Sequence, residues 1–122
     1  MIKITDKITE DNYHILFSCA DAQRTTPDEV IKIDGYLDLT GCTSLTSLPD
    51  NLSVTGDLYL TGCTSLTSLP DNLSVTGYLD LSGCTSLVSL PEHLKVGGNI
   101  YVDVDRVAEF KAMNKKFAKK IR

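Results

Sequence analysis

The segment GYLDLTGCTSLTSLPDNLSVT, residues 35–55, is followed directly by GDLYLTGCTSLTSLPDNLSVT, residues 56–76, and the two are identical at 19 of 21 positions. A third copy, GYLDLSGCTSLVSLPEHLKVG, occupies residues 77–97, and a partial fourth begins with GNIYVDV at residues 98–104. A fixed period of this length is typical of a solenoid, in which each repeat forms one coil that stacks on the next. The chain of 122 residues is therefore expected to be one domain built from a short run of coils.

The apolar residues of one copy indicate how a coil is arranged. Leu58 and Leu60 alternate with polar residues, which predicts a short strand with one buried face. Residues 65–73, SLTSLPDNL, leave no room for a long helix, and their proline and Asp-Asn pair favour a tight polar return. Each coil is therefore expected to contain a strand, a turn at Gly-Cys and an extended return path.

The solenoid needs a cap at each end, because an open end exposes apolar core and unpaired strand edges. We assign residues 1–34 to an N-terminal cap with a degenerate half-coil, residues 35–104 to three full repeats plus the partial fourth, and residues 105–122 to a basic, amphipathic C-terminal capping helix. The N-terminal cap is expected to contain a helix that begins after Thr9. The apolar face of the C-terminal helix comprises Val107, Phe110, Met113, Phe117 and Ile121. The predicted fold class is an α/β repeat: a short parallel β-solenoid with helical N- and C-terminal caps.

The repeat resembles the leucine-rich repeat, whose pattern is L-x-L-x-x-N/C-x-L. The segments LDLTGCTSL, LYLTGCTSL and LDLSGCTSL place two leucines and a cysteine at that spacing, with the last leucine one residue late. The LTSLP that follows is similar to the short, proline-containing repeats of bacterial effector-type and phage-encoded leucine-rich repeat proteins. This resemblance covers residues 35–104. It implies a binding role rather than an enzymatic one, with the strand face as the recognition surface.

The net charge of −4 conceals an uneven distribution. Residues 1–105 contain 5 Lys/Arg and 15 Asp/Glu, a net charge of −10, whereas residues 106–122 contain 7 Lys/Arg and one acid, a net charge of +6. Such asymmetry indicates polar partner surfaces, or a basic tail that shields part of an acidic body. Lys111, Lys115 and Lys119 would form one stripe of the predicted C-terminal helix, but the acidic body would repel phosphates, which leaves only a weak possibility of nucleic-acid binding.

No apolar stretch of the sequence approaches the roughly 18 residues that are needed to cross a bilayer. The first residues, MIKITDKITEDNY, lack the basic flank and apolar segment of a secretory signal. We therefore expect a cytoplasmic protein that does not associate with membranes.

The residues that could carry catalysis or bind a metal are few and scattered. Cys42, Cys63 and Cys84 recur at the repeat period, so they would stack about 4.8 Å apart. The outer pair, roughly 10 Å apart, could not share a zinc ion, whose bonds to sulfur are about 2.3 Å long. His14 and His93 have no nucleophile beside them, and no phosphate-binding glycine loop or Cys-x-x-Cys occurs. We expect buried, reduced, structural cysteines, no metal, no cofactor and no enzymatic activity.

The two positions that differ between the first copies exchange tyrosine and aspartate: Tyr36 and Asp38 become Asp57 and Tyr59. Both positions flank a buried leucine of the strand, so their side chains are expected to point outward. Stacking the copies in register gives one column of Tyr36, Asp57, Tyr78 and Asn99, a second of Asp38, Tyr59, Asp80 and Tyr101, and a third of Thr40, Thr61, Ser82 and Asp103. Four of the five tyrosines would then lie on one sheet face.

This alternation has two compatible interpretations. Identical copies would align like charges about 4.8 Å apart, so the exchange relieves repulsion and allows phenols to bond to carboxylates. The second interpretation is that the face binds a partner, because tyrosines offer a large amphipathic contact area and aspartates between them select cations.

We expect a small cytoplasmic protein–protein interaction module that binds a basic protein surface, as a bacterial or phage inhibitor or adaptor. The alternative is a nucleic-acid mimic that inhibits a DNA- or RNA-binding protein such as a host defence nuclease, which the charge of −10 on residues 1–105 favours. The sequence leaves the partner's identity and the oligomeric state open. The candidate partner-binding residues are Tyr36, Asp38, Asp57, Tyr59, Tyr78, Asp80, Asn99, Tyr101 and Asp103.

Overall fold

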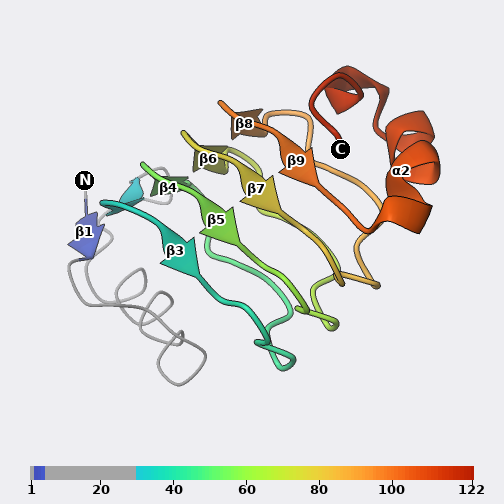
Figure 1. The fold of residues 1–122 in the computed structure, drawn as a ribbon. Helices are drawn as coiled ribbons and strands as arrows, with labels where there is room; N and C mark the ends of the chain where they lie inside the picture. Colours follow the sequence, from blue (N-terminus) through green and yellow to red (C-terminus); the bar gives the residue numbers. More distant parts are fainter. Residues whose placement is uncertain (1, 5–29) are drawn as a thin grey trace.

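The coils stack in parallel with a step of 21 residues (Figure 1). The computed structural model describes residues 2–4 and 30–122. In one column of the stack, Leu37 pairs with Leu58, Leu58 with Leu79, and Leu79 with Ile100. The predicted parallel β-solenoid is therefore confirmed, with about three turns. The helix predicted after Thr9 lies outside the described residues.

Each coil adds one strand to each of two parallel sheets in the described part of the chain. The first sheet contains, in this order, β3 (Leu37–Asp38), β5 (Leu58–Tyr59), β7 (Leu79–Asp80) and β9 (Ile100–Tyr101). The second contains β1 (Ile2–Ile4), β2 (Ile31–Ile33), β4 (Leu52–Val54), β6 (Ser74–Val75) and β8 (Lys95–Val96).

The second sheet differs from the prediction of one strand and an extended return in each coil. Its strand in the first coil, β4, buries Leu52 and Val54 completely and leaves Ser53 half-buried between them. This alternation of apolar and polar residues is the ordinary signature of a half-buried strand. The segment is short and directly follows the Asp-Asn corner. It therefore falls within the extended return path predicted from the sequence, which does not include a second strand.

Two corners of the first two coils, and one corner of the third, depend on left-handed backbone. At the Gly-Cys turn, Gly41, Gly62 and Gly83 have φ angles of 79°, 76° and 76°, which glycine adopts without a steric penalty. At the far end of the return path, Asn51 and Asn72 have φ angles of 58° and 62°. Asparagine is one of the few residues with a Cβ that tolerates this region. The glycine recurs in all three coils and the asparagine in the first two, so these residues fix where the chain turns there.

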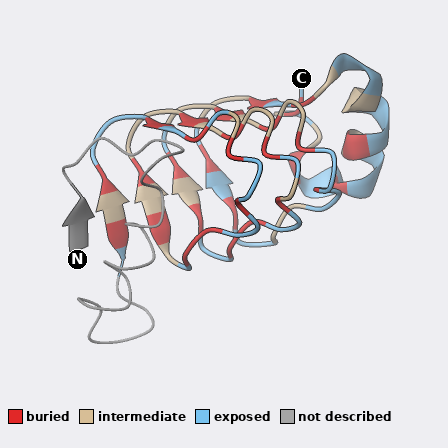
Figure 2. Ribbon diagram, turned by 90° about the horizontal axis from the view of Figure 1, so that it is seen from below, coloured by how far each residue is buried: buried red, intermediate tan, exposed pale blue. Residues whose placement is uncertain are grey.

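Stacked leucine side chains fill the interior of the solenoid. Figure 2 shows buried positions alternating with half-buried or exposed ones along the strands. Complete burial of one such side chain stabilises the fold by about 1.5–3 kcal/mol, so each coil adds a comparable layer of core. The second coil contributes the full predicted set, each at most 5% exposed: Leu58, Leu60, Cys63, Leu66, Leu69, Leu73 and Val75.

The C-terminal cap is not the single helix predicted for residues 105–122. It consists of η1 (Val104–Arg106), α2 (Val107–Met113) and η2 (Lys115–Phe117), drawn at the end of the stack in Figure 1. Phe110, Phe117 and Ile121 are buried as the apolar pattern predicts, whereas Met113 is 53% exposed. The prediction of a continuous helix is therefore wrong.

The helix ends at Met113 because the side chain of the next residue, Asn114, forms hydrogen bonds with main-chain groups of the third coil. Asn114 is buried, with non-helical φ and ψ angles of −128° and 59°. Its Oδ1 accepts a hydrogen bond from the Leu90 N–H at 2.7 Å, and its Nδ2 donates to the carbonyls of Val88 and Phe110 at 3.2 and 3.0 Å. The side chain thereby satisfies main-chain groups that have no further coil to pair with.

Three basic side chains extend this capping along the third coil. Arg106, Lys116 and Lys120 donate to main-chain carbonyls at distances of 2.5–2.9 Å. The acceptors are the carbonyls of Cys84, Leu87, Glu92 and Val96. Part of the positive charge of residues 106–122 therefore closes the end of the solenoid.

The stripe of Lys111, Lys115 and Lys119 does not exist as one face of a helix. Lys111 lies in α2, Lys115 in η2, and Lys119 in the turn that follows. The weak possibility of nucleic-acid binding through this stripe loses its geometric basis. Within residues 2–4 and 30–122, no helix has the length and apolar character needed to cross a membrane.

The end of the chain covers the edge of the first sheet. Ile121 forms a parallel bridge with Ile100 of β9. The Ile100 N–H donates to the Lys120 carbonyl, and the Arg122 N–H donates to the Ile100 carbonyl, both at 2.8 Å. Because charged side chains at a sheet edge discourage pairing with another chain, this ending protects the stack from edge-to-edge association.

We expect Asn114→Ala to lower the free energy of unfolding by about 2 kcal/mol, because it leaves main-chain groups of the third coil without partners. Lys115→Ala is the matched control: the residue is the next in sequence, is exposed, and its side chain bonds to no described residue. This control should change stability by no more than about 0.5 kcal/mol. Urea unfolding followed by circular dichroism measures both, and equal effects would contradict the capping role of Asn114.

Candidate functional site

The parallel register places the predicted site residues in columns on the outer face of the first sheet, here called the strand face. In the second column Asp38 pairs with Tyr59, Tyr59 with Asp80, and Asp80 with Tyr101. The residues one position earlier follow in the same register and form the first column. The strand face therefore comprises Tyr36, Asp57, Tyr78 and Asn99 in the first column and Asp38, Tyr59, Asp80 and Tyr101 in the second.

The four tyrosines of the strand face form a zigzag, which we call the tyrosine ladder: Tyr36, Tyr59, Tyr78 and Tyr101. Successive ring centroids are 6.3, 5.5 and 5.4 Å apart, and the ring planes meet at 75°, 86° and 89°. Edge-to-face pairs at such separations contribute about 0.5–1.5 kcal/mol each beyond their buried area. The exchange of tyrosine and aspartate produces this geometry, because it places the tyrosines of successive coils alternately in the first and the second column.

Asp57 holds the centre of the ladder together. Its Oδ1 accepts a hydrogen bond from the Tyr78 N–H at 2.9 Å, and its Oδ2 accepts one from the Tyr59 hydroxyl at 3.4 Å. The hydroxyl oxygens of Tyr59 and Tyr78 are 2.7 Å apart, so the second phenol completes the network. Both carboxylate oxygens of Asp57 are therefore committed within the molecule.

The same network raises the pKa of Tyr59 above its ordinary value. The main cause is the hydrogen bond with the Tyr78 hydroxyl; desolvation of the phenol and the nearby charge of Asp57 act in the same direction. Each of these effects disfavours the phenolate, so Tyr59 stays neutral and keeps its hydrogen bonds well into the alkaline range.

Asp38 and Asp80 of the second column are arranged differently from Asp57. Each turns one oxygen back to its own strand: Asp38 Oδ1 accepts from the Thr40 N–H at 3.0 Å, and Asp80 Oδ1 accepts from the Ser82 N–H at 2.9 Å. Within the described residues, the Oδ2 atoms of both aspartates accept no hydrogen bond. These carboxylates are therefore oriented by the backbone, and one oxygen of each, which we call open, accepts no hydrogen bond within the described residues; Asp38 is exposed and Asp80 half-buried.

Asp103 does not share this property. Both of its carboxylate oxygens accept from the Gly83 N–H, at 3.1 and 3.0 Å. In the preceding coils the equivalent glycine N–H donates to the carbonyl of the next coil, as Gly62 does to Ser82. The side chain of Asp103 thus replaces a main-chain acceptor at the point where the chain leaves the sheet, and the residue closes the ladder of hydrogen bonds.

The sequence treats the acids of the strand face as equivalent, and the structure separates them into two kinds. Asp38 and Asp80 each accept from the main-chain N–H of the residue two positions later, a local bond that aspartate commonly forms. Asp57 is followed by a tyrosine at that place and bonds to the next coil instead. Because Tyr59 also has a main-chain N–H, the residue type two positions later gives no signal, and the division between open and committed carboxylates follows from the structure alone.

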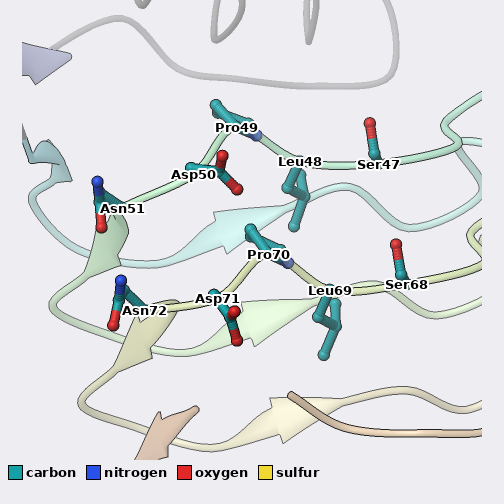
Figure 3. Close-up of a pocket in the computed structure, with 10 residues that line it drawn as sticks. All are labelled: Ser47, Leu48, Pro49, Asp50, Asn51, Ser68, Leu69, Pro70, Asp71 and Asn72. Carbon is teal, nitrogen blue, oxygen red and sulfur yellow. The ribbon is translucent and has the colours of Figure 1, made fainter. Parts of the chain in front are cut away.

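A groove of about 700 Å³ runs across the return path of the first two coils (Figure 3). The corresponding part of the third coil is occupied by Asn114, which bonds to Leu90 and Val88. The groove is walled by prolines and polar side chains and contains no aromatic residue. It therefore offers less than the strand face for recognition. Its lining residues are Ser47, Leu48, Pro49, Asp50, Asn51, Ser68, Leu69, Pro70, Asp71 and Asn72.

The three repeat cysteines, Cys42, Cys63 and Cys84, are buried inside the stack and form no disulfide. The Cys63 thiol donates to the Leu39 carbonyl at 3.2 Å, and the Cys84 thiol donates to the Leu60 carbonyl at 3.0 Å. Burial raises the pKa of Cys63, and burial together with the neighbouring Cys63 raises the pKa of Cys84 to about 12. No group of three or more potential metal ligands occurs in the described part of the chain. The repeat cysteines therefore act as small core residues.

Comparisons with protein-family models, with curated proteins and with solved structures found no match to this chain. The parallel β-solenoid with its 21-residue step is shown by the register of the strands.

We predict that Tyr59 loses its proton only well above the ordinary tyrosine pKa near 10 when the pH is raised. Because its pKa is higher in the fold than the usual value near 10, its contribution to stability is complete below about pH 10 and is lost as the pH rises further. An ultraviolet difference titration, with circular dichroism to detect unfolding, should show a late phase that disappears in Tyr59→Phe. Asp57→Asn should move this phase to lower pH, and loss of the Tyr59 proton near pH 10 in the unsubstituted protein would contradict the network.

The thiols of the repeat cysteines should be unreactive in the folded protein. In a Cys19→Ala background, which leaves Cys42, Cys63 and Cys84, we expect no reaction with an aromatic disulfide reagent at pH 8 and three equivalents after unfolding in urea. Rapid reaction of one thiol in the folded state would show that this part of the core opens.

Proposed function

We propose that the protein is a small interaction module whose strand face binds a basic surface of another protein. The observation that carries this proposal is the combination of an ordered tyrosine ladder with two carboxylates, Asp38 and Asp80, that are fixed by the backbone and keep one oxygen open. A cationic side chain that enters this face can pair with a carboxylate and lie on a tyrosine ring at the same time.

The geometry favours binding because little order has to be gained when a partner arrives. Each ring of the tyrosine ladder is held by its neighbours, and the central pair is also fixed by the hydrogen bonds with Asp57. Side chains that are already ordered lose little conformational entropy on association. Tyr36 remains 56% exposed and Tyr101 36% exposed, so the ends of the ladder offer ring surface to a partner.

The sequence resemblance supports the choice of face. In the leucine-rich repeat proteins that the 21-residue motif resembles, the strand face is the usual recognition surface. We therefore assign the chain to a leucine-rich-repeat-like class of binding proteins, and we propose that it acts in the cytoplasm as an inhibitor or adaptor of bacterial or phage origin. Nothing in this role requires a cofactor or an enzymatic step.

The nucleic-acid mimic is less well supported. A mimic must present many free negative charges, because duplex DNA carries one charge per about 1.7 Å of its axis. Asp57 of the strand face, and Asp103 of the third column, each use both carboxylate oxygens in hydrogen bonds within the molecule itself. The remaining pair of open carboxylates, spaced by two coils, suits individual cations better than a continuous phosphate-binding channel.

The test begins with affinity capture of a partner and proceeds to the affinity of that partner for variants. Tyr59→Ala and Tyr78→Ala should each weaken binding by about 1–3 kcal/mol, as truncation of central aromatic residues at interfaces does. Asp80→Asn should slow association and reduce its dependence on salt. Asp71→Asn, an acidic change of the same kind on the return path, is the control and should have no effect. A captured protein whose affinity is unchanged in all three strand-face variants would refute the proposal.

A double variant separates the two interpretations of the exchange. Tyr36→Asp with Asp38→Tyr makes the first copy identical to the second and places Asp directly beside Asp57. Charge relief alone predicts a lower free energy of unfolding and an unchanged affinity for the partner. A recognition role predicts that affinity falls as well, because one open carboxylate is lost and the ladder is interrupted.

A further inference from the structure

The two open carboxylates of the strand face have a defined spacing. Asp38 and Asp80 occupy the same column, separated by Tyr59 of the intervening coil. Neighbouring strands of a sheet lie about 4.8 Å apart, so these carboxylates are about 9.6 Å apart along the axis of the solenoid. A partner that uses both must present two cations at that separation on one side of its own backbone.

Few backbone conformations meet this requirement. In a polyproline II helix every third residue points the same way, and three residues advance about 9.3 Å. A β-strand places side chains on one side every about 6.7 Å or about 13 Å, and both values miss the spacing. An α-helix places residues i and i+4 about 6 Å apart, and only i and i+7, at about 10.5 Å, come near.

We propose that the strand face binds an extended, polyproline-II-like peptide with arginine or lysine at every third residue, lying along the solenoid axis with successive cations on Asp38 and Asp80. This proposal rests on the proposed function and specifies the form of its basic partner. Acidic and aromatic residues on one face suit such peptides, because their prolines pack against aromatic rings and their conformation is already ordered before binding.

The tyrosine ladder supplies the aromatic part of this surface. Tyr59 lies in the same column as both carboxylates, midway between them, and contacts Tyr36 and Tyr78 of the other column at near-perpendicular ring angles. Because adjacent rings are perpendicular, the ladder presents ring faces and edges alternately and is not a flat stack. The residues between two cations of the peptide would lie over Tyr59 and against the flanking rings.

Charge also sets where the peptide ends. The C-terminal residues continue the first sheet beyond β9, with Ile121 paired to Ile100, so Arg122 follows Tyr101 in the second column. A cation at this position would repel a third basic residue placed one peptide repeat beyond Asp80. The face therefore accommodates two cations, over the coils that contain β3, β5 and β7.

Three synthetic peptides test the spacing. Each has two arginines in a proline-rich host, separated by two, three or four positions, and binding is measured by fluorescence anisotropy at low and moderate salt. We expect the three-residue spacing to bind about tenfold more tightly than the other two, which corresponds to about 1.4 kcal/mol. Asp38→Asn and Asp80→Asn should each remove this preference, whereas Asp71→Asn on the return path should leave it intact.

A fourth peptide, a basic α-helix with arginines at i and i+7, distinguishes failure of this inference from failure of the proposed function. If it binds in a Tyr78-dependent manner while the three extended peptides do not, the face binds cations and the polyproline II inference is wrong. If no peptide binds in a manner that depends on Tyr78, both this inference and the basic-partner proposal fall. Equal affinities for the three extended peptides would also overturn the inference.

Discussion

The fixed register between successive coils is the constraint on which the rest of the molecule depends. The N–H groups of Leu37, Leu58 and Leu79 each donate to the carbonyl of the residue that precedes the equivalent apolar residue in the next coil, at 2.9, 3.0 and 2.9 Å. A ladder of this kind cannot slip by one residue without turning the buried leucines to the outside. Once the ladder is fixed, every position of the repeat becomes a column of neighbours. Whether a side chain is buried, contacts another aromatic ring or is repelled by a like charge then depends on the residues that share its column.

The same ladder creates a difficulty at its end, because the last full coil has main-chain groups that no further coil can pair. The C-terminal segment resolves this with side chains rather than with another strand: Asn114 serves one part of the return path, and Arg106, Lys116 and Lys120 serve carbonyls around the rest of the coil. Bonds from charged donors to carbonyls are stronger than neutral ones. The positive charge that the sequence concentrates after residue 105 therefore has a structural use.

The parts of the fold that follow from periodicity were predictable, and those that follow from single side chains were not. A repeat identical at 19 of 21 positions determines the step, the leucine core and the columns of the strand face. The end of α2 depends instead on Asn114. The sequence around Asn114 continues the helical pattern, so it does not predict that the side-chain amide bonds to the backbone of the third coil. The second sheet was visible in the alternation of Leu73, Ser74 and Val75, but a proline and two polar residues before it suggested a turn. For the strand face, the columns were predictable, whereas the division between committed and open carboxylates required atomic positions.

On the proposed function, the exchange of tyrosine and aspartate connects the stability of the sheet with the recognition of a partner. With identical copies, the carboxylates would share one column about 4.8 Å apart and the phenols would share the other, so repulsion would accumulate along the stack. The alternation instead gives each column one carboxylate for every two coils among the three full repeats, and it links the rings diagonally across the columns. It also makes the chemical repeat of the surface two coils long, although the backbone repeat is one coil. A partner that recognises this face must match the longer period, so an arrangement that stabilises the sheet also limits which ligands can fit it.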